Sequence, residues 1–365
     1  MASAIKPQDL VIHVLNVGFG DAILIEFPAD SKGQRSYGLV DCYDFDKTRG
    51  YLNKVRKLRP GHSQLAFLCA THPHWDHIKG IKKFVTSEKY RPKEFWDSGF
   101  RHSHKTYEEI LMALRAHDVK TEVKTVRVTS GMEWYFGKVR ITALAPSVQL
   151  RNQYATYGVD MNNASIVLRL EHHAEDVLSV ESKEYKGKVS LEDIRAAGQS
   201  VVILAGDAEF DSWARIVSEY PRLEKTAGHD PLVKEMINRL ACAVIKVAHH
   251  GSMHSTPLDA YEKMAPEVAI VSTEQEESTK TIGGVKVTRR MFPHQLAAIT
   301  LEECGARVLT TDGSYESQDV GDGTLKDADC AHPGSIVVVV PPGGRARWAK
   351  LHDTKDDVPQ PPTVV

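Results

Sequence analysis

The segment from Thr71 to His77 holds the residues with the most evident chemistry, three histidines and one aspartate in seven positions. Two residues apart in an extended segment, His72 and His74 point the same way and can bind one metal ion. Asp76 and His77 follow after a turn and can bind a second. Imidazole and carboxylate ligands suit Zn, Mn or Fe, and the segment lacks the cysteines of a closed structural zinc site. The alternative is a polar loop rich in histidine by chance, but the spacing favours a two-metal loop.

A buried strand is expected to position this loop. Residues 64–70 are almost wholly apolar and do not alternate strictly, which is typical of a strand buried on both faces. Open α/β sheets bind ligands at the carboxyl ends of such strands. Three further predicted strands, over 37–40, 201–205 and 243–248, lead into Asp41, Asp207 and the pair His249 and His250. Four strand ends with acid or imidazole groups predict one shared site.

The composition limits the class of protein. The chain has 365 residues, of which 42% are hydrophobic, enough for a large core in one large α/β domain or two small ones. Because 46 basic and 48 acidic residues nearly balance, any binding to nucleic acid must be local. Neither a signal peptide nor an apolar run of about 18 residues is found, so we expect a soluble cytoplasmic protein without membrane contact. Five dispersed cysteines without a CxxC motif predict buried reduced thiols rather than a disulfide or a nucleophile.

The remaining pattern predicts strands and helices in two β-rich halves. A hairpin is expected from 11–17 and 22–27, and amphipathic helices over 47–58 and 107–116. The second half repeats this pattern, with helices over 258–264 and 294–304. Two such halves flanked by helices predict an α/β fold, a four-layer αββα sandwich. We expect a single domain over 1–352, loop insertions near 174–200 and 274–289, and a disordered, proline-containing tail over 353–365.

Several motifs occur together in a fixed order: VLNVGFGDAILI at 14–25, HPHWDH at 72–77, NNASIVL at 162–168, LAGDAE at 204–209 and KVAHHGS at 246–252. This set resembles the metallo-β-lactamase superfamily, and within it the ComEC-type branch, the soluble hydrolase domain of competence proteins. The resemblance covers about residues 11 to 345. Membrane-spanning competence proteins fuse this domain to a pore, and no span is found here, so DNA uptake is not implied.

The resemblance implies a ligand set for two metals. His72 and His74 would bind the first metal, Asp76 and His77 the second, and Asp207 would bridge both. Two divalent ions, Zn or Mn, are therefore the expected cofactors.

Other positions are less determined by the resemblance. His249 would complete the second site, whereas His250 would take that role instead or face the substrate. Asp41 would orient a ligand or the water from behind the ligands. The residues expected to serve catalysis are thus Asp76, Asp41 and His250.

One departure from the superfamily concerns the first metal. Many members place a histidine before the strand at 164–170, where this chain has Asp160, Asn162 and Asn163. An asparagine carbonyl is a hard oxygen ligand, which shifts the preference from Zn toward Mn or Mg. The first metal site is therefore expected to lack its third imidazole.

The ligand set and the resemblance predict a dinuclear metal-dependent hydrolase, a phosphodiesterase or nuclease acting through a metal-bridging hydroxide. The expected partner is a phosphodiester substrate, with nucleic acid and nucleotides as candidates, and protein partners are left open. Asn163, Ser252 and His294 are the residues expected to contact it. The alternatives are hydrolysis of a phosphocholine ester, a thioester or a lactam, and a non-catalytic regulatory module with a vestigial site.

Overall fold

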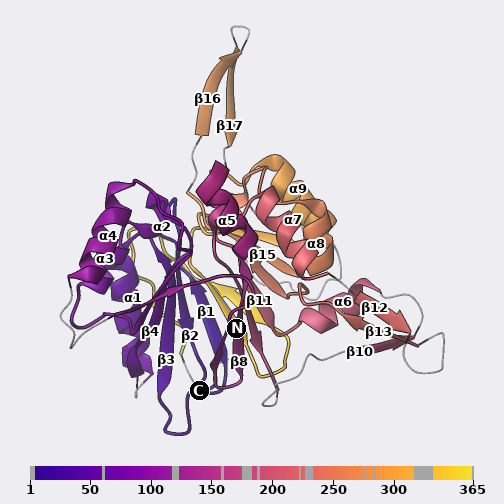
Figure 1. Ribbon diagram of the computed structural model, residues 1–365, viewed down its shortest axis with the longest axis horizontal. Coiled ribbons are helices and arrows are strands. Elements are labelled where there is room, and N and C mark those ends of the chain that lie inside the picture. Colours follow the sequence, from indigo (N-terminus) through magenta and orange to yellow (C-terminus); the bar gives the residue numbers. More distant parts are fainter. Residues whose placement is uncertain are drawn as a thin grey trace.

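The computed structural model describes residues 5–59, 62–116, 123–157, 160–174, 183–186, 190–221, 223–226, 233–274, 277–282, 285–290, 292–315 and 332–363. Two large mixed β-sheets form its centre (Figure 1). In spatial order, sheet A contains β20 (Arg347–Lys350), β19 (Ile336–Val340), β1 (Leu10–Val14), β2 (Ala22–Glu26), β3 (Arg35–Cys42), β4 (His62–Ala70), β5 (Glu94–Asp97) and β6 (Lys124–Arg127). Sheet B contains β18 (Arg307–Thr310), β15 (Val268–Val271), β14 (Val244–Lys246), β11 (Val201–Leu204), β9 (Val167–His172), β8 (Val139–Ala145) and β7 (Glu133–Phe136).

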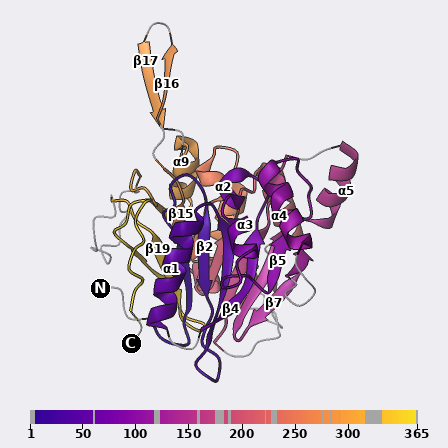
Figure 2. The same cartoon turned by 90° about the vertical axis from the view of Figure 1, so that its left-hand side faces the viewer.

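Helices cover the outer face of each sheet (Figures 1 and 2). On sheet A lie α1 (Phe45–Leu58), α2 (Trp75–Ile78), α3 (Ile81–Val85) and α4 (Lys105–Arg115). On sheet B lie α7 (Phe210–Glu219), α8 (Leu258–Met264) and α9 (Gln295–Glu303). The remaining helical elements are α5 (Val148–Tyr157), α6 (Leu191–Gly198) and the 3-10 turns η2 (Asn162–Ala164) and η3 (Ala248–Gly251).

Three apolar layers hold these elements together. The middle layer takes buried side chains from the facing sides of both sheets, among them Ile25 and Leu168. One outer layer joins α1, α3 and α4 to sheet A, and the other joins α7, α8 and α9 to sheet B. The predicted four-layer αββα sandwich is therefore confirmed.

Helix α1 shows how the sequence produces one of these layers. The Asp44 side chain accepts a hydrogen bond from the backbone N–H of Lys47 at 2.9 Å, which caps the first turn. Tyr51, Leu52 and Val55 follow at helical spacing and are fully buried against sheet A. The helix therefore begins at a capped residue and packs through a single apolar stripe.

Parallel strands at the centre of each sheet position the predicted site. Strands β3 to β6 are parallel in sheet A, and β11, β14, β15 and β18 are parallel in sheet B. Carboxyl ends of parallel strands meet at one edge of a sheet. Asp41, the loop at 71–77, Asp207 and His249 therefore lie at corresponding edges, as predicted from the strand ends.

Several elements lie outside the predicted pattern. The fully buried run Ile336–Val340 forms β19 between β1 and β20. In the first expected insertion, β10 (Lys183–Lys186) forms a small sheet with β12 (Leu223–Thr226) and β13 (Val233–Ile237), which lie outside it. In the second, β16 (Glu277–Ile282) pairs with β17 (Val285–Arg290). Residues 175–182, 187–189, 275–276 and 283–284 of these insertions lie outside the described residues.

The prediction of a disordered tail is wrong for residues 353–363. Asp353 is buried, and its Oδ2 accepts a hydrogen bond from Lys47 Nζ at 2.8 Å. Its Oδ1 accepts one from the backbone N–H of Ser335 at 2.7 Å. The tail is held by polar contacts with α1 and with Ser335, the residue before β19, which its proline content does not reveal. Residues 364–365 lie outside the described part of the chain.

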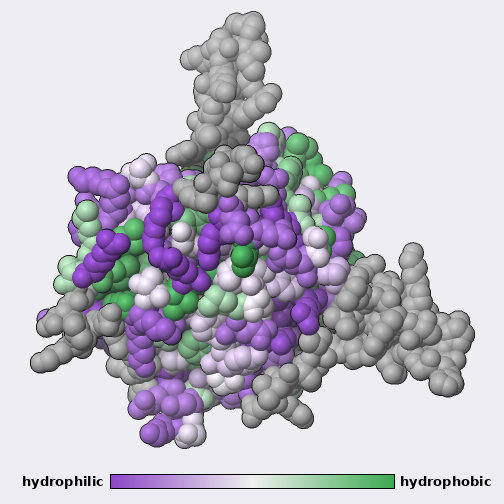
Figure 3. Space-filling view, viewed as in Figure 1, coloured by the Kyte–Doolittle hydropathy of each residue, from purple (hydrophilic) through white to green (hydrophobic). Residues whose placement is uncertain are grey.

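The surface of the face seen in Figure 3 is mostly hydrophilic, with small hydrophobic groups between the polar residues. Within the described ranges, no helix combines the length and the apolar composition needed to cross a bilayer. The four described cysteines, Cys42, Cys69, Cys242 and Cys304, are buried and free, as the sequence predicted; Cys330 lies outside the described residues.

Candidate metal centre

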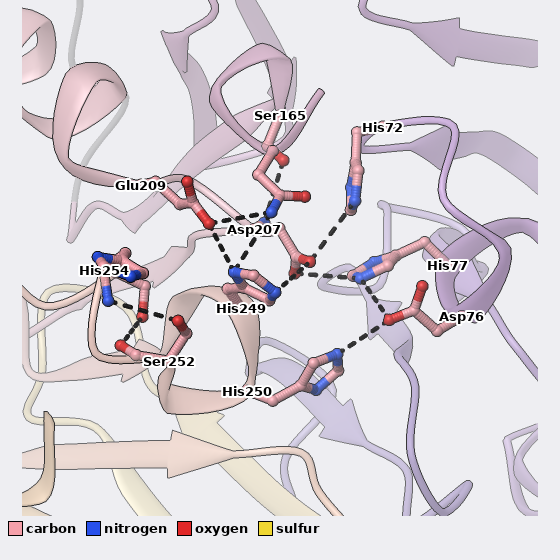
Figure 4. Close-up of polar contacts among 12 residues, drawn as sticks. His72, Asp76, His77, Ser165, Asp207, Glu209, His249, His250, Ser252 and His254 are labelled. Atoms are coloured by element: carbon pink, nitrogen blue, oxygen red, sulfur yellow. Dashed lines mark hydrogen bonds and ion pairs between the residues drawn. The ribbon is translucent and has the colours of Figure 1, made fainter. Parts of the chain in front are cut away.

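The loop after β4 meets the strand end of β11 at a single carboxylate. Ligand atoms of His72, His74 and Asp207 lie within 4.8 Å of one another. Those of Asp76, His77, Asp207 and His250 form a second such group. Asp207 belongs to both groups, and in Figure 4 its carboxylate faces both His72 and His77. The structure thus brings together His72 and Asp207, which lie 135 positions apart. The bridging role expected of Asp207 stays a prediction.

The atoms that face each other in this centre lie at ion-pair distance but form no hydrogen bond of acceptable geometry. Among the described residues, His72 Nε2, His77 Nε2 and Asp207 Oδ1 are buried without a hydrogen-bond partner. His72 Nε2 lies 3.5 Å from Asp207 Oδ2, and His77 Nε2 lies 3.1 Å from Asp207 Oδ1. Buried polar atoms are normally paired, because desolvation without a partner is costly. Nitrogen and carboxylate oxygen donors that converge in this way fit divalent cations.

The outer nitrogens of two imidazoles are fixed by acceptors. His77 Nδ1 donates to Asp41 Oδ2 at 2.7 Å, and His250 Nδ1 donates to the carbonyl oxygen of Ser272 at 2.7 Å. The other ring nitrogen of His250, Nε2, lies within hydrogen-bonding distance of Asp76 Oδ2, at 3.2 Å. Metal-binding histidines usually show this arrangement. Asp41 therefore lies behind His77, at the position expected of an orienting residue.

The charges of the centre are strongly coupled. Burial disfavours a charge on His77, but Asp207, Asp41 and Asp76 outweigh it and raise the pKa of this imidazole well above its ordinary value. Burial likewise opposes ionisation of Asp207, yet His77 and His72 hold the pKa of this carboxyl well below its usual range. Burial, reinforced by His77, lowers the pKa of His72 well below its ordinary value. His72 therefore stays neutral, with a lone pair available for a metal.

The structure distinguishes the positions of His249 and His250, which the sequence could not. His250 joins Asp76, His77 and Asp207, whereas His249 Nε2 stands 4.0 Å from Asp207 Oδ2, with a quarter of its side chain exposed. Both residues adopt left-handed backbone conformations, with φ of 47° and 52°. This turn sends the two side chains in different directions. By position, His250 rather than His249 belongs to the second group of candidate ligands.

Glu209 is a site residue that the sequence reasoning missed. Its Oε1 lies 2.9 Å from His249 Nδ1 and accepts a hydrogen bond from Asn162 Nδ2 at 3.0 Å (Figure 4). These contacts leave Asn162 Oδ1 buried and without a partner among the described residues. The only signal in the sequence was the position of Glu209, two residues after Asp207.

The three residues expected to contact substrate make local hydrogen bonds. Asn163 is buried, and its Oδ1 accepts from the backbone N–H of Ser212 in the first turn of α7 at 3.0 Å. His294 Nδ1 accepts from the backbone N–H of Leu296 at 3.2 Å and caps α9. Ser252 lies in the turn after His250, and its Oγ accepts from the backbone N–H of His254 at 3.4 Å. Their contact with substrate stays a prediction.

A second missed pair joins the two sheets beneath the centre. Lys246, at the end of β14, forms a fully buried ion pair with Asp21, which follows the turn after β1. Asp21 Oδ2 also lies 3.9 Å from His77 Nδ1. Burial would raise the pKa of Asp21, but Lys246 and the nearby histidines lower it. Both residues lie within motifs quoted above, which was the available signal.

No family model matches the sequence, and no curated protein matches it. Solved structures do match. The metallo-β-lactamase fold protein YhfI from Bacillus subtilis is 12% identical, with 84% of this chain and 99% of that chain covered and a TM-score of 0.40. Unliganded yeast PDE1 is 11% identical, with 84% and 97% covered and a TM-score of 0.43. A metallo-β-lactamase of Cronobacter sakazakii is 13% identical, with 56% and 63% covered and a TM-score of 0.26. Identities and scores at this level say nothing of activity or substrate.

Proposed function

We propose that the protein is a metal-dependent hydrolase of the ComEC-type branch of the metallo-β-lactamase superfamily that binds two divalent cations and cleaves phosphodiester bonds. One observation carries this proposal. Buried His72 Nε2, His77 Nε2 and Asp207 Oδ1 converge without hydrogen-bond partners among the described residues. Two groups of donors share Asp207, and this is the arrangement that a pair of cations bridged by a carboxylate requires.

Each cation would have its own set of donors. His72, His74 and Asp207 would hold the first, with the buried amide oxygen of Asn162 as a further hard donor in place of a third imidazole. The second would be held by Asp76, His77, Asp207 and His250. Imidazole and carboxylate donors of this kind suit Zn and Mn.

The residues around the donors fix their orientation. Asp41 and the Ser272 carbonyl hold the outer nitrogens of His77 and His250, so the inner nitrogens face Asp207 and Asp76. Divalent cations at such a site supply Lewis acidity toward a phosphoryl oxygen and lower the pKa of water. His249, held by Glu209 at the exposed side of Asp207, is the residue that would contact the substrate.

The surroundings of the first group of donors favour an anionic substrate. The His102 ring lies 5.9 Å from the His74 ring, and α4 begins three residues later. The first turn of a helix presents free N–H groups and the positive end of its dipole. A phosphodiester carries a negative charge that these groups would stabilise, whereas a lactam or a thioester is neutral at the reacting group.

Metal analysis and hydrolysis assays test the proposal together. The purified protein should bind two Zn or Mn ions per chain and hydrolyse bis(p-nitrophenyl) phosphate faster than thioester or lactam substrates. Asp207→Ala should lose both ions, because it removes the shared donor, and His250→Ala should lose one. His249→Ala should keep both and lose activity.

Each contrary result rejects a different part of the proposal, either the phosphodiesterase activity or the metal centre. His352→Ala, at an exposed position outside both groups, is the matched control and should behave as wild type. Two bound ions without hydrolysis of any phosphodiester would reject the phosphodiesterase and keep the metal centre. Full metal content in Asp207→Ala would reject the centre itself.

A further inference from the structure

The candidate metal donors are divided between the two sheets. The loop at 71–77 follows β4 of sheet A, whereas Asp207 follows β11 and His250 follows β14, both of sheet B. Each of the two groups of donors takes members from both sheets. The layer between the sheets is apolar, and apolar contacts are not directional. Directional contacts between the sheets are therefore needed to fix the spacing of the donors.

One set of directional contacts lies at the first group of donors. The backbone N–H of Ile166, which precedes β9 of sheet B, donates to the carbonyl oxygen of Thr71 at 2.9 Å. The neighbouring Ser165 Oγ accepts a hydrogen bond from the backbone N–H of Asp207 at 3.1 Å. Through these two hydrogen bonds, Asp207 is connected with the residue before His72. The first group is thus held across the sheets by its own backbone contacts.

The second group is held across the sheets by the buried ion pair of Lys246 and Asp21. Lys246 is the last residue of β14, and Asp21 immediately precedes β2. Both side chains are 1% exposed. The backbone N–H of Asp21 donates to the carbonyl oxygen of Asp76 at 3.2 Å. The pair therefore connects the strand that leads into His250 with Asp76, whose Oδ2 lies 3.2 Å from His250 Nε2.

The energetics of a buried ion pair favour a role in position over a role in stability. Taking an ammonium and a carboxylate out of water costs about as much as their attraction returns, so apolar side chains of similar volume often stabilise a fold equally well. A buried polar contact is directional, however, and can select one packing arrangement. Among the described residues, Asp21 is the only ion-pair partner of Lys246. Loss of this pair would release the contact between β14 and the loop after β4.

We propose that Lys246 is a positioning residue that, through Asp21, holds His250 at the distance from the loop after β4 that the second cation requires. This inference rests on the two-cation centre of the proposed function and names a residue that fixes the spacing of its second site. Lys246 belongs to neither group of donors, so it would act only through Asp21 and through β14. Both partners of the link belong to the protein, so the link would be in place before a cation binds.

Three double variants separate the link from its charges. D21L/K246M removes the pair without leaving a lone buried charge. D21Q/K246Q also carries no charge, but it keeps a hydrogen-bonding pair with the same number of side-chain bonds between the two strands. K47M/D353L is the matched control, because it removes a second buried Lys–Asp pair, which joins α1 to the tail at 2.8 Å.

Isothermal titration of the metal-free proteins with Zn or Mn measures both sites, and His250→Ala identifies the phase that belongs to the second site. In D21L/K246M the second cation should bind at least about tenfold more weakly, while the first should stay within about threefold of wild type. Both sites should stay within about threefold of wild type in D21Q/K246Q and in K47M/D353L. Metal-free D21L/K246M should unfold at a urea concentration no lower than wild type, because an apolar pair replaces a buried ion pair.

Several results would overturn the positioning role. The second cation could bind D21L/K246M as tightly as wild type, both sites could weaken equally, or the control could weaken the second site as much. Equal weakening in D21Q/K246Q and D21L/K246M would show that the charges matter rather than the link. A metal-free D21L/K246M that is unfolded, or that unfolds at a lower urea concentration, would show that the pair serves stability.

The titrations also separate this inference from the proposed activity, because they do not require hydrolysis. Wild-type protein that binds two cations but cleaves no phosphodiester would reject the activity alone, and the variants would still decide the role of Lys246. Wild-type protein that binds fewer than two cations would reject the second site and the positioning role together.

Discussion

Replacing Asp41 by asparagine should weaken one metal site more than the other. The Asp41 carboxylate accepts hydrogen bonds from the Thr71 N–H at 2.8 Å, the Thr71 hydroxyl at 2.7 Å and His77 Nδ1 at 2.7 Å. In Asp41→Asn one oxygen still accepts from Thr71, but an NH₂ group faces the imidazole. That group donates, so His77 Nδ1 must accept, and the proton moves to Nε2. Nε2 is the atom that faces Asp207 and would bind the second cation.

The expected cost follows from this change of tautomer. Loss of a partner behind a metal ligand typically lowers metal affinity by about 10- to 100-fold, or roughly 1.4 to 2.7 kcal/mol. Asp41 is 1% exposed and His77 is fully buried, so water cannot replace the lost contact, and we expect the upper part of this range. The φ of Asp41 is +56°, a conformation that asparagine also adopts, so the backbone should be retained.

Isothermal titration of the metal-free protein with Zn or Mn measures the effect. The second site should weaken in Asp41→Asn more than the first, because Asp41 contacts His77 directly but is connected to His72 only through the Thr71 hydroxyl. Asp46→Asn, an exposed change of the same charge, is the control. An unchanged second site, or equal weakening of both sites, would refute the reasoning.

Two further predictions concern stability and pH. Asp353→Ala leaves the buried ammonium of Lys47 without its carboxylate partner. The free energy of unfolding, measured in urea, should therefore fall by about 3 to 5 kcal/mol. A loss below about 1 kcal/mol would contradict the energetic importance of this buried ion pair. Burial opposes a charge on His77, but Asp207, Asp41 and Asp76 outweigh it and raise the pKa of this imidazole above its ordinary value of 6.5. A metal ion that binds His77 at neutral pH must therefore displace a proton. Affinity for the second cation should therefore rise about tenfold per pH unit above 6.5 until the raised pKa is passed. Titrations in buffers of different ionisation enthalpy should show this proton released, and no release between about pH 6.5 and 8 would contradict the assignment.

The candidate ligands differ in how far the sequence could identify them. The segment at 71–77 was predictable because its residues are neighbours in the chain, and their spacing fixes which can face one metal. Asp207 was predictable because parallel strands place their carboxyl ends at one edge. By contrast, Glu209, Asp21 and Lys246 act through partners at distant positions, which no local pattern encodes.

The sequence by itself determined the layered α/β architecture and the chemical types of the donors, because hydrophobic periodicity and residue spacing are local properties. Only the tertiary structure decided that His250 rather than His249 faces Asp76, since two consecutive left-handed residues set the direction of each ring. It also decided that the tail is ordered, through the pair of Lys47 and Asp353, which lie 306 positions apart. Such contacts depend on the distance between segments in space, and composition carries no information about that distance.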